Sequence, residues 1–531
     1  MRKLLIRLGL AACACAATAI ATAPVASSVG TDVVTYHNDN ARTGQNLTET
    51  SLTLSNVNAS LFGKVTGLTL DGKVDAEPLY LSGLNIPGRG AVDVLYAATE
   101  HGTVYALDAV TLSLIWSKTM LVGSEMPSEA VFGCGQVTPE IGVTATPVID
   151  RARGVIYVVA MSKSGTTYIQ RLHALDLTSG AELFGGPKLI TAPGFDPKAY
   201  EERSALTLAN SQVILAFTSH CDADPYNGWV MSYNPATLVQ NSVLQVTQSG
   251  KRGAIWMAGA GPAADSAGNV FLLDGNGTFD TTLNGSGFPI NGNFGNAFLK
   301  ISTTLGALSV SDYFAMSNTV AESNADQDLG SGGTLLLPDM IDSGGVTRHL
   351  AVGAGKDGHI YVVNRDSMGK FNPSANLIYQ DITGAIGGVW SMPAYFNNTL
   401  YYGASGDNLK AFPIASARVA TTAATRSAGT FTYPGTTPSI SASGTSNAIV
   451  WAVENSNPAA LHAYNAANLG QELYNTRQAP NSRDSFGNGN KFITPMIVNG
   501  RVYVGTQTGV AVFGLLTGPA APTNVRIVPA H

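Results

Sequence analysis

The sequence contains few charged residues and no strong excess of either sign. Asp, Glu, Lys and Arg make up 12% of the 531 residues, and the formal net charge is −6. Domains that bind nucleic acid usually carry a basic patch or stripe, and no segment of this chain is basic enough to form one. We therefore expect no nucleic-acid partner.

Long apolar runs are absent beyond the N-terminus, so the sequence predicts no transmembrane span. The N-terminus has basic residues up to Arg7 and then the small, apolar run Leu8–Ala23, which is the order of a secretory signal peptide. We predict a signal peptide at residues 1–26, cleaved somewhere from Ala23 to Ser28, and a secreted or periplasmic protein.

Cysteine is scarce, with four residues in the chain. Cys13 ends a Leu-Ala-Ala-Cys sequence that resembles a lipoprotein cleavage site, but the apolar stretch before it, Leu8–Ala12, is short, so lipid anchoring is the less favoured route. After signal removal Cys134 and Cys221 remain, and in an oxidising compartment such a pair predicts a disulfide; two separate buried thiols are the alternative. The chain has no Cys-x-x-Cys-His motif, so it encodes no covalent haem.

No long linker, charge block or low-complexity run divides the chain before its last fifteen residues. We therefore predict one large domain at residues 32–516, followed by a Pro-rich tail or linker stub at residues 517–531. Glycine is abundant, with 58 residues, and Ser, Thr and Asn are frequent. This balance is typical of exported all-β proteins.

A short internal repeat organises this domain: an apolar strand, often one that ends in Asp or Asn. Its copies lie roughly 45–75 residues apart, the spacing of four-stranded propeller blades or somewhat above it. The eight copies are Val104–Asp108, Leu172–Asp176, Val230–Asn234, Phe298–Ile301, Ile360–Asn364, Leu409–Phe412, Leu461–Asn465 and Val510–Phe513. One twisted sheet cannot bury both faces alone, whereas eight packed radially can. We predict an all-β, eight-bladed β-propeller of four-stranded antiparallel blades.

The ends of the domain predict how the ring closes. The eighth unit supplies three strands, at Ile493–Val498, Arg501–Thr506 and Gly509–Leu515, and then the chain runs out. A spare apolar segment, Phe62–Leu70, precedes the first unit. We expect this N-terminal strand to be the fourth strand of the last blade.

The stretch Gly253–Asp280 joins the repeat to residues that suggest chemistry. Its pattern predicts a tight hairpin, with strands at Ala258–Asp265 and Val270–Asp274. Trp256 precedes the hairpin and Asn276 follows it between two glycines, which would let the backbone turn and present the amide outward.

The repeat resembles that of the quinoprotein β-propellers, which include the pyrroloquinoline quinone (PQQ)-dependent alcohol dehydrogenases and non-enzymatic relatives. Segments Thr35–Gly44, Thr138–Gly142, Asp328–Gly333 and Gly353–Gly358 also resemble a set of exported proteins described as PQQ-like. The resemblance covers nearly all of the mature chain and implies the propeller fold. Propellers of this kind serve as enzymes, scaffolds and binding platforms, so the fold does not decide the function.

The resemblance also implies a cofactor site. The family's Trp beneath the quinone corresponds to Trp256, and its calcium-binding Asn to Asn276. The general base corresponds to Asp326, and the Lys that touches a quinone carbonyl to Lys356. The adjacent-cysteine pair often found over the quinone is absent here, and Asp326 lacks the Trp that accompanies the base in the family.

The family's calcium-binding Glu falls where this chain has Asp222 and Asp224. Calcium prefers oxygen ligands, so Asn276 with either Asp could hold it. A bound Ca²⁺ would polarise a quinone carbonyl, and Asp326 would take the hydroxyl proton while hydride passes to the quinone. Lys356 would stabilise charge on the reduced oxygen. Without an encoded haem, such an enzyme needs an external electron acceptor.

Other interpretations of these residues remain open. Trp256 could be core packing, Asn276 a left-handed turn residue, and Lys356 a solvated hairpin residue. The protein would then be a non-catalytic propeller that binds carbohydrate or protein at the cell surface, through residues at the starts of the innermost strands: Glu77, Glu140, Glu201, Glu202 and Arg203. A hydrolase or lyase is a third class, but no paired-carboxylate motif indicates one.

Overall fold

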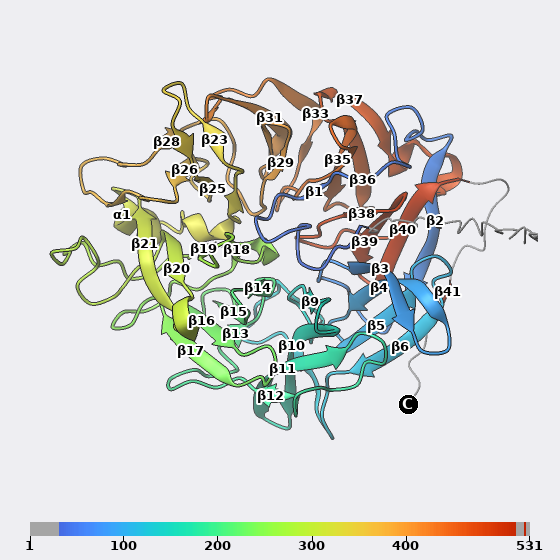
Figure 1. Ribbon diagram of the computed structural model, residues 1–531, viewed down its shortest axis with the longest axis horizontal. Helices are drawn as coiled ribbons and strands as arrows, with labels where there is room; N and C mark the ends of the chain where they lie inside the picture. The colour runs from blue at the N-terminus through green and yellow to red at the C-terminus, as the bar shows by residue number, and fades with distance from the viewer. Residues whose placement is uncertain (1–30, 517–524, 527–531) are drawn as a thin grey trace, which may run out of the picture.

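The computed structural model describes residues 31–516 and the short strand β41 (Val525–Arg526). The predicted signal peptide and its alternative lipid-anchor site at Cys13 lie outside the described residues, as does most of the predicted tail. Eight sheets of antiparallel strands surround a central channel, and chain order follows the ring (Figure 1). The eight-bladed propeller predicted from the repeat is confirmed.

The first four blades each have four main strands, given from the channel outward. Blade 1 has β3 (Leu79–Ile86), β4 (Gly90–Ala98), β5 (Thr103–Asp108) and β6 (Leu114–Thr119). Blade 2 has β9 (Val148–Asp150), β10 (Val155–Ser164), β11 (Thr167–Asp176) and β12 (Lys188–Leu189). Blade 3 has β14 (Thr207–Ala209), β15 (Gln212–Ser219), β16 (Trp229–Tyr233) and β17 (Gln240–Gln245). Blade 4 has β18 (Ala263–Ala264), β19 (Val270–Leu273), β20 (Ala297–Ser302) and β21 (Ser309–Ala315).

The last four blades repeat the arrangement. Blade 5 has β22 (Leu335–Leu336), β25 (Leu350–Ala354), β26 (Ile360–Asn364) and β28 (Gln380–Ile382). Blade 6 has β29 (Ala394–Phe396), β30 (Thr399–Gly403), β31 (Asp407–Ala415) and β33 (Thr425–Phe431). Blade 7 has β34 (Ser439–Ser443), β35 (Ser446–Glu454), β36 (Ala460–Asn465) and β37 (Asn468–Asn475). Blade 8 has β38 (Met496–Val498), β39 (Arg501–Thr506), β40 (Gly509–Leu515) and β2 (Phe62–Thr69).

Short accessory elements extend several blades. The additional strands are β1 (Gln45–Asn46), β7 (Met126–Glu129), β8 (Glu140–Ile141), β13 (Tyr200–Glu201), β23 (Met340–Ile341), β24 (Thr347–Arg348), β27 (Lys370–Phe371) and β32 (Arg418–Val419). The described helices are α1 (Thr319–Asn324) and the 3₁₀ turns η1 (Met257–Gly259), η2 (Thr304–Gly306), η3 (Leu329–Ser331), η4 (Thr476–Gln478) and η5 (Pro480–Ser482). None of these helices is long and apolar enough to cross a membrane.

The predicted closure of the ring is confirmed. Strand β2 pairs antiparallel with β40, from Phe62 opposite Leu515 to Thr69 opposite Gly509, and Figure 1 shows the two strands side by side in blade 8. The free edge of β2 carries β41 in parallel. A piece of the tail, which was expected to lie outside the ring, therefore adds a strand to the last blade.

The repeat joins neighbouring blades as well as turning the chain within each blade. Asp108 ends its strand and accepts hydrogen bonds from the backbone N–H groups of the turn that follows, and Asp176 does the same in blade 2. Tyr96 and Trp116 of blade 1 both donate to the carbonyl of Leu177, directly after Asp176. Each capped turn thus presents a carbonyl to the preceding blade, where buried aromatic donors require acceptors.

The N-terminal segment at residues 33–48, here called the channel plug, contacts all eight blades. It exchanges backbone hydrogen bonds with the innermost strands or the residues beside them in blades 1, 2, 4, 5, 6 and 7. Side chains complete the set: Asn40 and Arg42 bond to blade 3, and Asn46 bonds to Ile497 in blade 8. Arg42 is fully buried, and its donors are met by Thr35, Thr207 and backbone carbonyls.

One predicted element is wrong in part. The hairpin expected at Ala258–Asp265 and Val270–Asp274 forms only where Ala263 and Ala264 pair with Phe271 and Val270. Residues 257–259 instead form the turn η1, with Met257 and Ala258 in left-handed backbone conformations. The small, apolar composition fits this turn as well as a strand, because both are buried against the channel.

Candidate functional site

A pocket opens at the end of the channel away from the plug. Its lining residues precede the innermost strands: Glu201 in blade 3, Trp256 in blade 4, Ser331 in blade 5, Trp390 in blade 6 and Tyr433 in blade 7. The plug contacts each of these blades at residues that come later in the chain, such as Leu208 and Ala264. The inner strands therefore run from the pocket toward the plug.

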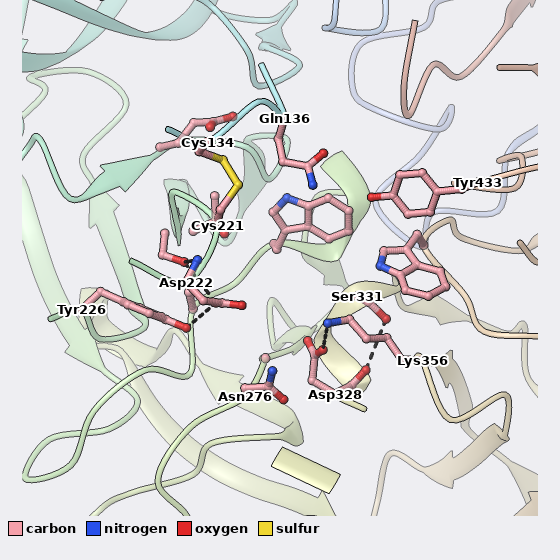
Figure 2. A pocket seen from close by; sticks show the side chains of 17 residues that line it. Cys134, Gln136, Cys221, Asp222, Tyr226, Asn276, Asp328, Ser331, Lys356 and Tyr433 are labelled. Atoms are coloured by element: carbon pink, nitrogen blue, oxygen red, sulfur yellow. Dashed lines mark hydrogen bonds and ion pairs between the residues drawn. A yellow bond between two sulfur atoms is a disulfide. The ribbon is translucent and has the colours of Figure 1, made fainter. Parts of the chain in front are cut away.

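Trp256 lies in the pocket lining and is not packed between blades. It comes just before η1, is half-buried, and meets the ring of Phe492 edge-on at 4.8 Å between ring centroids. Trp390 and Tyr433 also line the pocket, and their rings meet at 5.5 Å. Phe492 also lies 6.2 Å from the Tyr433 ring, which links these rings into one aromatic wall. Figure 2 shows Tyr433 across the pocket from Asp222.

Asn276 presents a free acceptor to the pocket. Its Nδ2 donates to Asp326 Oδ1 at 2.6 Å, which fixes the amide orientation, while Oδ1 is buried and has no hydrogen-bond partner among the described residues. A buried, unpaired amide oxygen costs free energy unless a donor or a cation meets it. The flanking Gly277 allows its backbone to lie close to that of Gly253, because a Cβ there would lie 2.6 Å from the backbone nitrogen of Gly253. Neither this glycine nor Asn276 has the positive φ that the turn interpretation required.

Lys356 connects the two aspartates that follow α1. Its Nζ lies 2.6 Å from Asp326 Oδ1 and 2.7 Å from Asp328 Oδ1; Figure 2 shows it pointing at Asp328. The Asp326 side chain is 66% exposed and lies at the mouth, outside the lining, whereas that of Asp328 is 10% exposed and lines the pocket. Burial raises the pKa of Asp328 to about 6, against the lowering effect of Lys356.

The structure separates the two candidate carboxylates of the 222–224 loop. Asp222 lines the pocket, accepts a hydrogen bond from the Tyr226 hydroxyl, and is near enough to raise the pKa of Asp328 by charge repulsion. Asp224 lies outside the lining and is held by Arg252, with Nη2 to Oδ2 at 2.6 Å. Of the two, Asp222 is the residue that the fold brings to the other site residues.

The predicted disulfide between Cys134 and Cys221 is confirmed, and both cysteines line the pocket. It links the loop before β8 in blade 2 to the loop that carries Asp222 in blade 3. Figure 2 shows it on the far side of the pocket from Tyr433. The bond closes a segment of 87 residues, so it holds two otherwise distant loops against one cavity.

Left-handed backbone conformations gather around the pocket. Cys221, Asp222, Met257, Ala258 and Asp326 have φ angles between 44° and 57°. Such conformations are uncommon outside glycine and persist where surrounding contacts enforce them, often at functional sites. They aim Asp222 and Asp326 toward the same space.

The charges in this site fit a bound cation. When Asp222, Asp326 and Asp328 are all ionised, Lys356 balances one of three negative charges and leaves an excess of two. The oxygens of Asn276, Asp222 and Asp328 are of the type that Ca²⁺ prefers. Residues 31–516 contain no cluster of three or more His, Cys, Asp or Glu side chains arranged as a metal site, so a cation here depends on the amide oxygen and on ligand or solvent oxygens.

The size of the pocket limits how a flat ring system could lie in it. Its free space is about 120 Å³, and about 670 Å³ when the part open to solvent is counted. Sites for small molecules and cofactors usually measure about 300–1,000 Å³. The enclosed part of the pocket is smaller than such sites, so most of a tricyclic quinone on Trp256 would lie in the open mouth, which Trp390 and Tyr433 also line.

Sequence reasoning missed several of these residues. In the sequence, Asp328 stands out only as the first residue of the segment Asp328–Gly333, although it lies two residues after the candidate base Asp326. Gln136, Trp390 and Tyr433 carry no local signal, because only the ring brings their loops together. Of the groove candidates, Glu201 lines the pocket, and burial raises its pKa to about 7. Others lie elsewhere; Glu77, for example, accepts the backbone N–H of His37 in the plug.

No protein-family model and no curated protein matches the sequence. Solved structures do match. The quinohemoprotein alcohol dehydrogenase from Comamonas testosteroni is 16% identical with a TM-score of 0.60, and the match covers 93% of this chain and 81% of that one. The quinohemoprotein alcohol dehydrogenase ADHIIG from Pseudomonas putida HK5 is 15% identical with a TM-score of 0.61, and the match covers 94% of this chain and 82% of that one. A europium-containing methanol dehydrogenase is 13% identical with a TM-score of 0.59, and the match covers 92% of this chain and 99% of that one. At these identities the likeness concerns the fold alone: this chain shares an eight-bladed propeller with these structures.

Proposed function

We propose that this protein is an exported dehydrogenase that oxidises alcohol or sugar hydroxyl groups with PQQ and a calcium-type cation in the pocket. The observation that carries the proposal is the bonded set Asn276–Asp326–Lys356–Asp328, assembled from blades 4 and 5 beside Trp256. The shared fold supports it, and the disulfide supports an oxidising compartment.

Different residues of the chain would hold the cation and the quinone. Asn276 Oδ1, Asp222 and Asp328 would hold the cation, and Trp256 would support the face of the quinone. When bound, the quinone supplies the two-electron acceptor for the hydride, and the cation supplies Lewis acidity. Glu201 and the disulfide line the same pocket.

Asp326 is the proposed base. Its Oδ1 already accepts from Asn276 and Lys356, which orients the carboxylate and leaves Oδ2 to accept a hydroxyl proton from a substrate at the open mouth. Lys356 would hold Asp326 and stabilise negative charge nearby. Because its carboxylate is largely exposed, Asp326 can pass the proton to solvent. Electrons would leave to an external acceptor.

The test loads purified protein with PQQ and Ca²⁺ and follows reduction of an artificial electron-accepting dye on addition of alcohols and sugars. We expect turnover in the wild type. Asp326→Asn should lose it while still binding quinone, because the change removes the base and keeps the amide–carbonyl contacts. Quinone-loaded wild type without turnover on any hydroxyl compound would contradict the proposal and favour a non-catalytic binding platform.

A further inference from the structure

A second cleft adjoins the pocket. This side cleft has about 610 Å³ of free space and lies where blades 8, 1 and 2 meet, between residues 71–73, 100–101, 135–140 and 489–491. Gln136 lines both the side cleft and the pocket. The pocket and the side cleft are therefore neighbours with Gln136 between them.

The carboxylates that line the side cleft already have partners. Asp71 accepts the hydroxyl groups of Thr99 and Thr103 at 2.8 and 2.6 Å. Glu140 pairs with His101 at 2.9 Å. These two acids therefore have less capacity left for a cationic ligand.

Glu100, the third acid of the side cleft, is held inside the protein. One oxygen accepts the N–H of Gly142 and the hydroxyl of Thr144, both at 2.9 Å. Burial and then the charge of Asp75 raise the pKa of Glu100 well above its ordinary range, while Lys73 and Arg203 keep that of Asp75 low despite burial.

Two lysines line the side cleft, and Lys73 already pairs with Asp75 at 2.8 Å. Lys491 donates to Gln136 Oε1 at 3.3 Å and lies 5.9 Å from the centre of the Tyr433 ring. Within the described part of the chain it pairs with no Asp or Glu. Burial, followed by repulsion from Lys73 and Arg203, lowers the pKa of Lys491, although Asp75 acts to raise it.

Arg203 adds to this surplus of donors. Its guanidinium is 4% exposed, lies 4.9 Å from the Phe492 ring, and comes no closer than 3.7 Å to its acidic neighbour Asp75. Its Nε is buried without a hydrogen-bond partner in the described structure. Arg203 thus has donor capacity that Asp75 does not fully meet, whereas Lys491 itself lines the side cleft.

We propose that the side cleft binds the carboxylate group of the substrate through Lys491, while the substrate hydroxyl group reaches Asp326 in the pocket. The substrate class is then hydroxylated carboxylic acids, such as acidic sugars, whose ring can lie against Tyr433. A single negative charge fits better than the double charge of a phosphate, because ionised Asp75 lies nearby. This inference rests on the proposed function for the hydroxyl end, but the carboxylate site can be tested without quinone.

The first experiment measures binding of D-glucuronate and D-glucose to quinone-free protein by titration calorimetry. We expect glucuronate to bind at least tenfold more tightly, and Lys491→Met to remove most of that difference. Lys118→Met, on the outer strand β6 of blade 1, is the matched control and should change nothing. Equal binding of the two sugars, or glucuronate binding unchanged in Lys491→Met, would overturn the inference.

The second experiment uses quinone-loaded enzyme. Lys491→Met should raise KM for glucuronate at least tenfold with little change in kcat, and leave KM for glucose unchanged, because the lysine contacts only the carboxylate end. A fall in kcat for both sugars would contradict this role. If the wild type binds glucuronate but no quinone, the proposed function fails and the carboxylate site stands.

Discussion

Asp328 should make the cation-free protein less stable as the pH rises. Its pKa in the folded protein is about 6, above the ordinary value of 3.8, so the unfolded chain releases this proton first. The stabilising effect of the proton is complete below about pH 4 and is lost as the pH rises through about 6. Each pKa difference of one corresponds to about 1.4 kcal/mol, so the loss by pH 7.5 is about 3 kcal/mol.

The perturbation is Asp328→Asn, studied in EDTA by urea unfolding followed by tryptophan fluorescence. The difference in unfolding free energy, variant minus wild type, should grow by about 3 kcal/mol between pH 4 and pH 7.5, because only the wild type must ionise a buried group. Asp342→Asn is the control with the opposite sign, since hydrogen bonds to Asp342 lower its pKa. A difference for Asp328→Asn that stays constant with pH would refute the reasoning.

Three further predictions concern the amide, the disulfide and the plug. Asn276→Ala should weaken Ca²⁺ binding by about 10- to 100-fold in calorimetry, because it removes the free Oδ1 and the donor that fixes Asp326; unchanged affinity would place the cation elsewhere. Replacing Cys134 and Cys221 with Ser should cost about 4 kcal/mol in urea unfolding, as expected for an 87-residue loop, and should also weaken Ca²⁺ binding by freeing Asp222. Gly44→Ala should cost about 3 kcal/mol or more, because its Cβ would lie 2.2 Å from the buried His37 ring at a φ of 68°; the control Gly83→Ala, with a φ of 55° and open space around it, should cost about 1 kcal/mol.

Much of the fold could be predicted because its signals are local and repeated. Each blade contains its own strands and turns, so eight copies of one pattern indicated eight blades, and the missing strand of the last copy indicated closure by β2. The channel plug could not be found in this way. Its motif at residues 35–44 gave a resemblance, but its hydrogen bonds reach residues up to several hundred positions away.

Candidate residues could be predicted where a short motif marked the position. They could not be predicted where the backbone conformation determines which side chain faces the pocket. Trp256, Asn276 and Lys356 followed from short patterns, and the structure brings them together with Asp326. The choice between Asp222 and Asp224 depended on the left-handed backbone at Asp222 and on Arg252, which holds Asp224 away. The burial of Asp328 arises from packing beside Gly275, where a Cβ would lie 3.0 Å from its Oδ2, and no sequence pattern reports that contact.

The central claim is that one pocket holds a quinone and a cation together. Titration of the purified protein with PQQ, followed by quenching of tryptophan fluorescence, tests it most directly. We expect saturable binding of one quinone per chain in Ca²⁺, much weaker binding in EDTA, and loss of most of the quenching in Trp256→Phe. Absence of quinone binding in Ca²⁺, or binding that is indifferent to Ca²⁺, Asn276 and Trp256 alike, would contradict it.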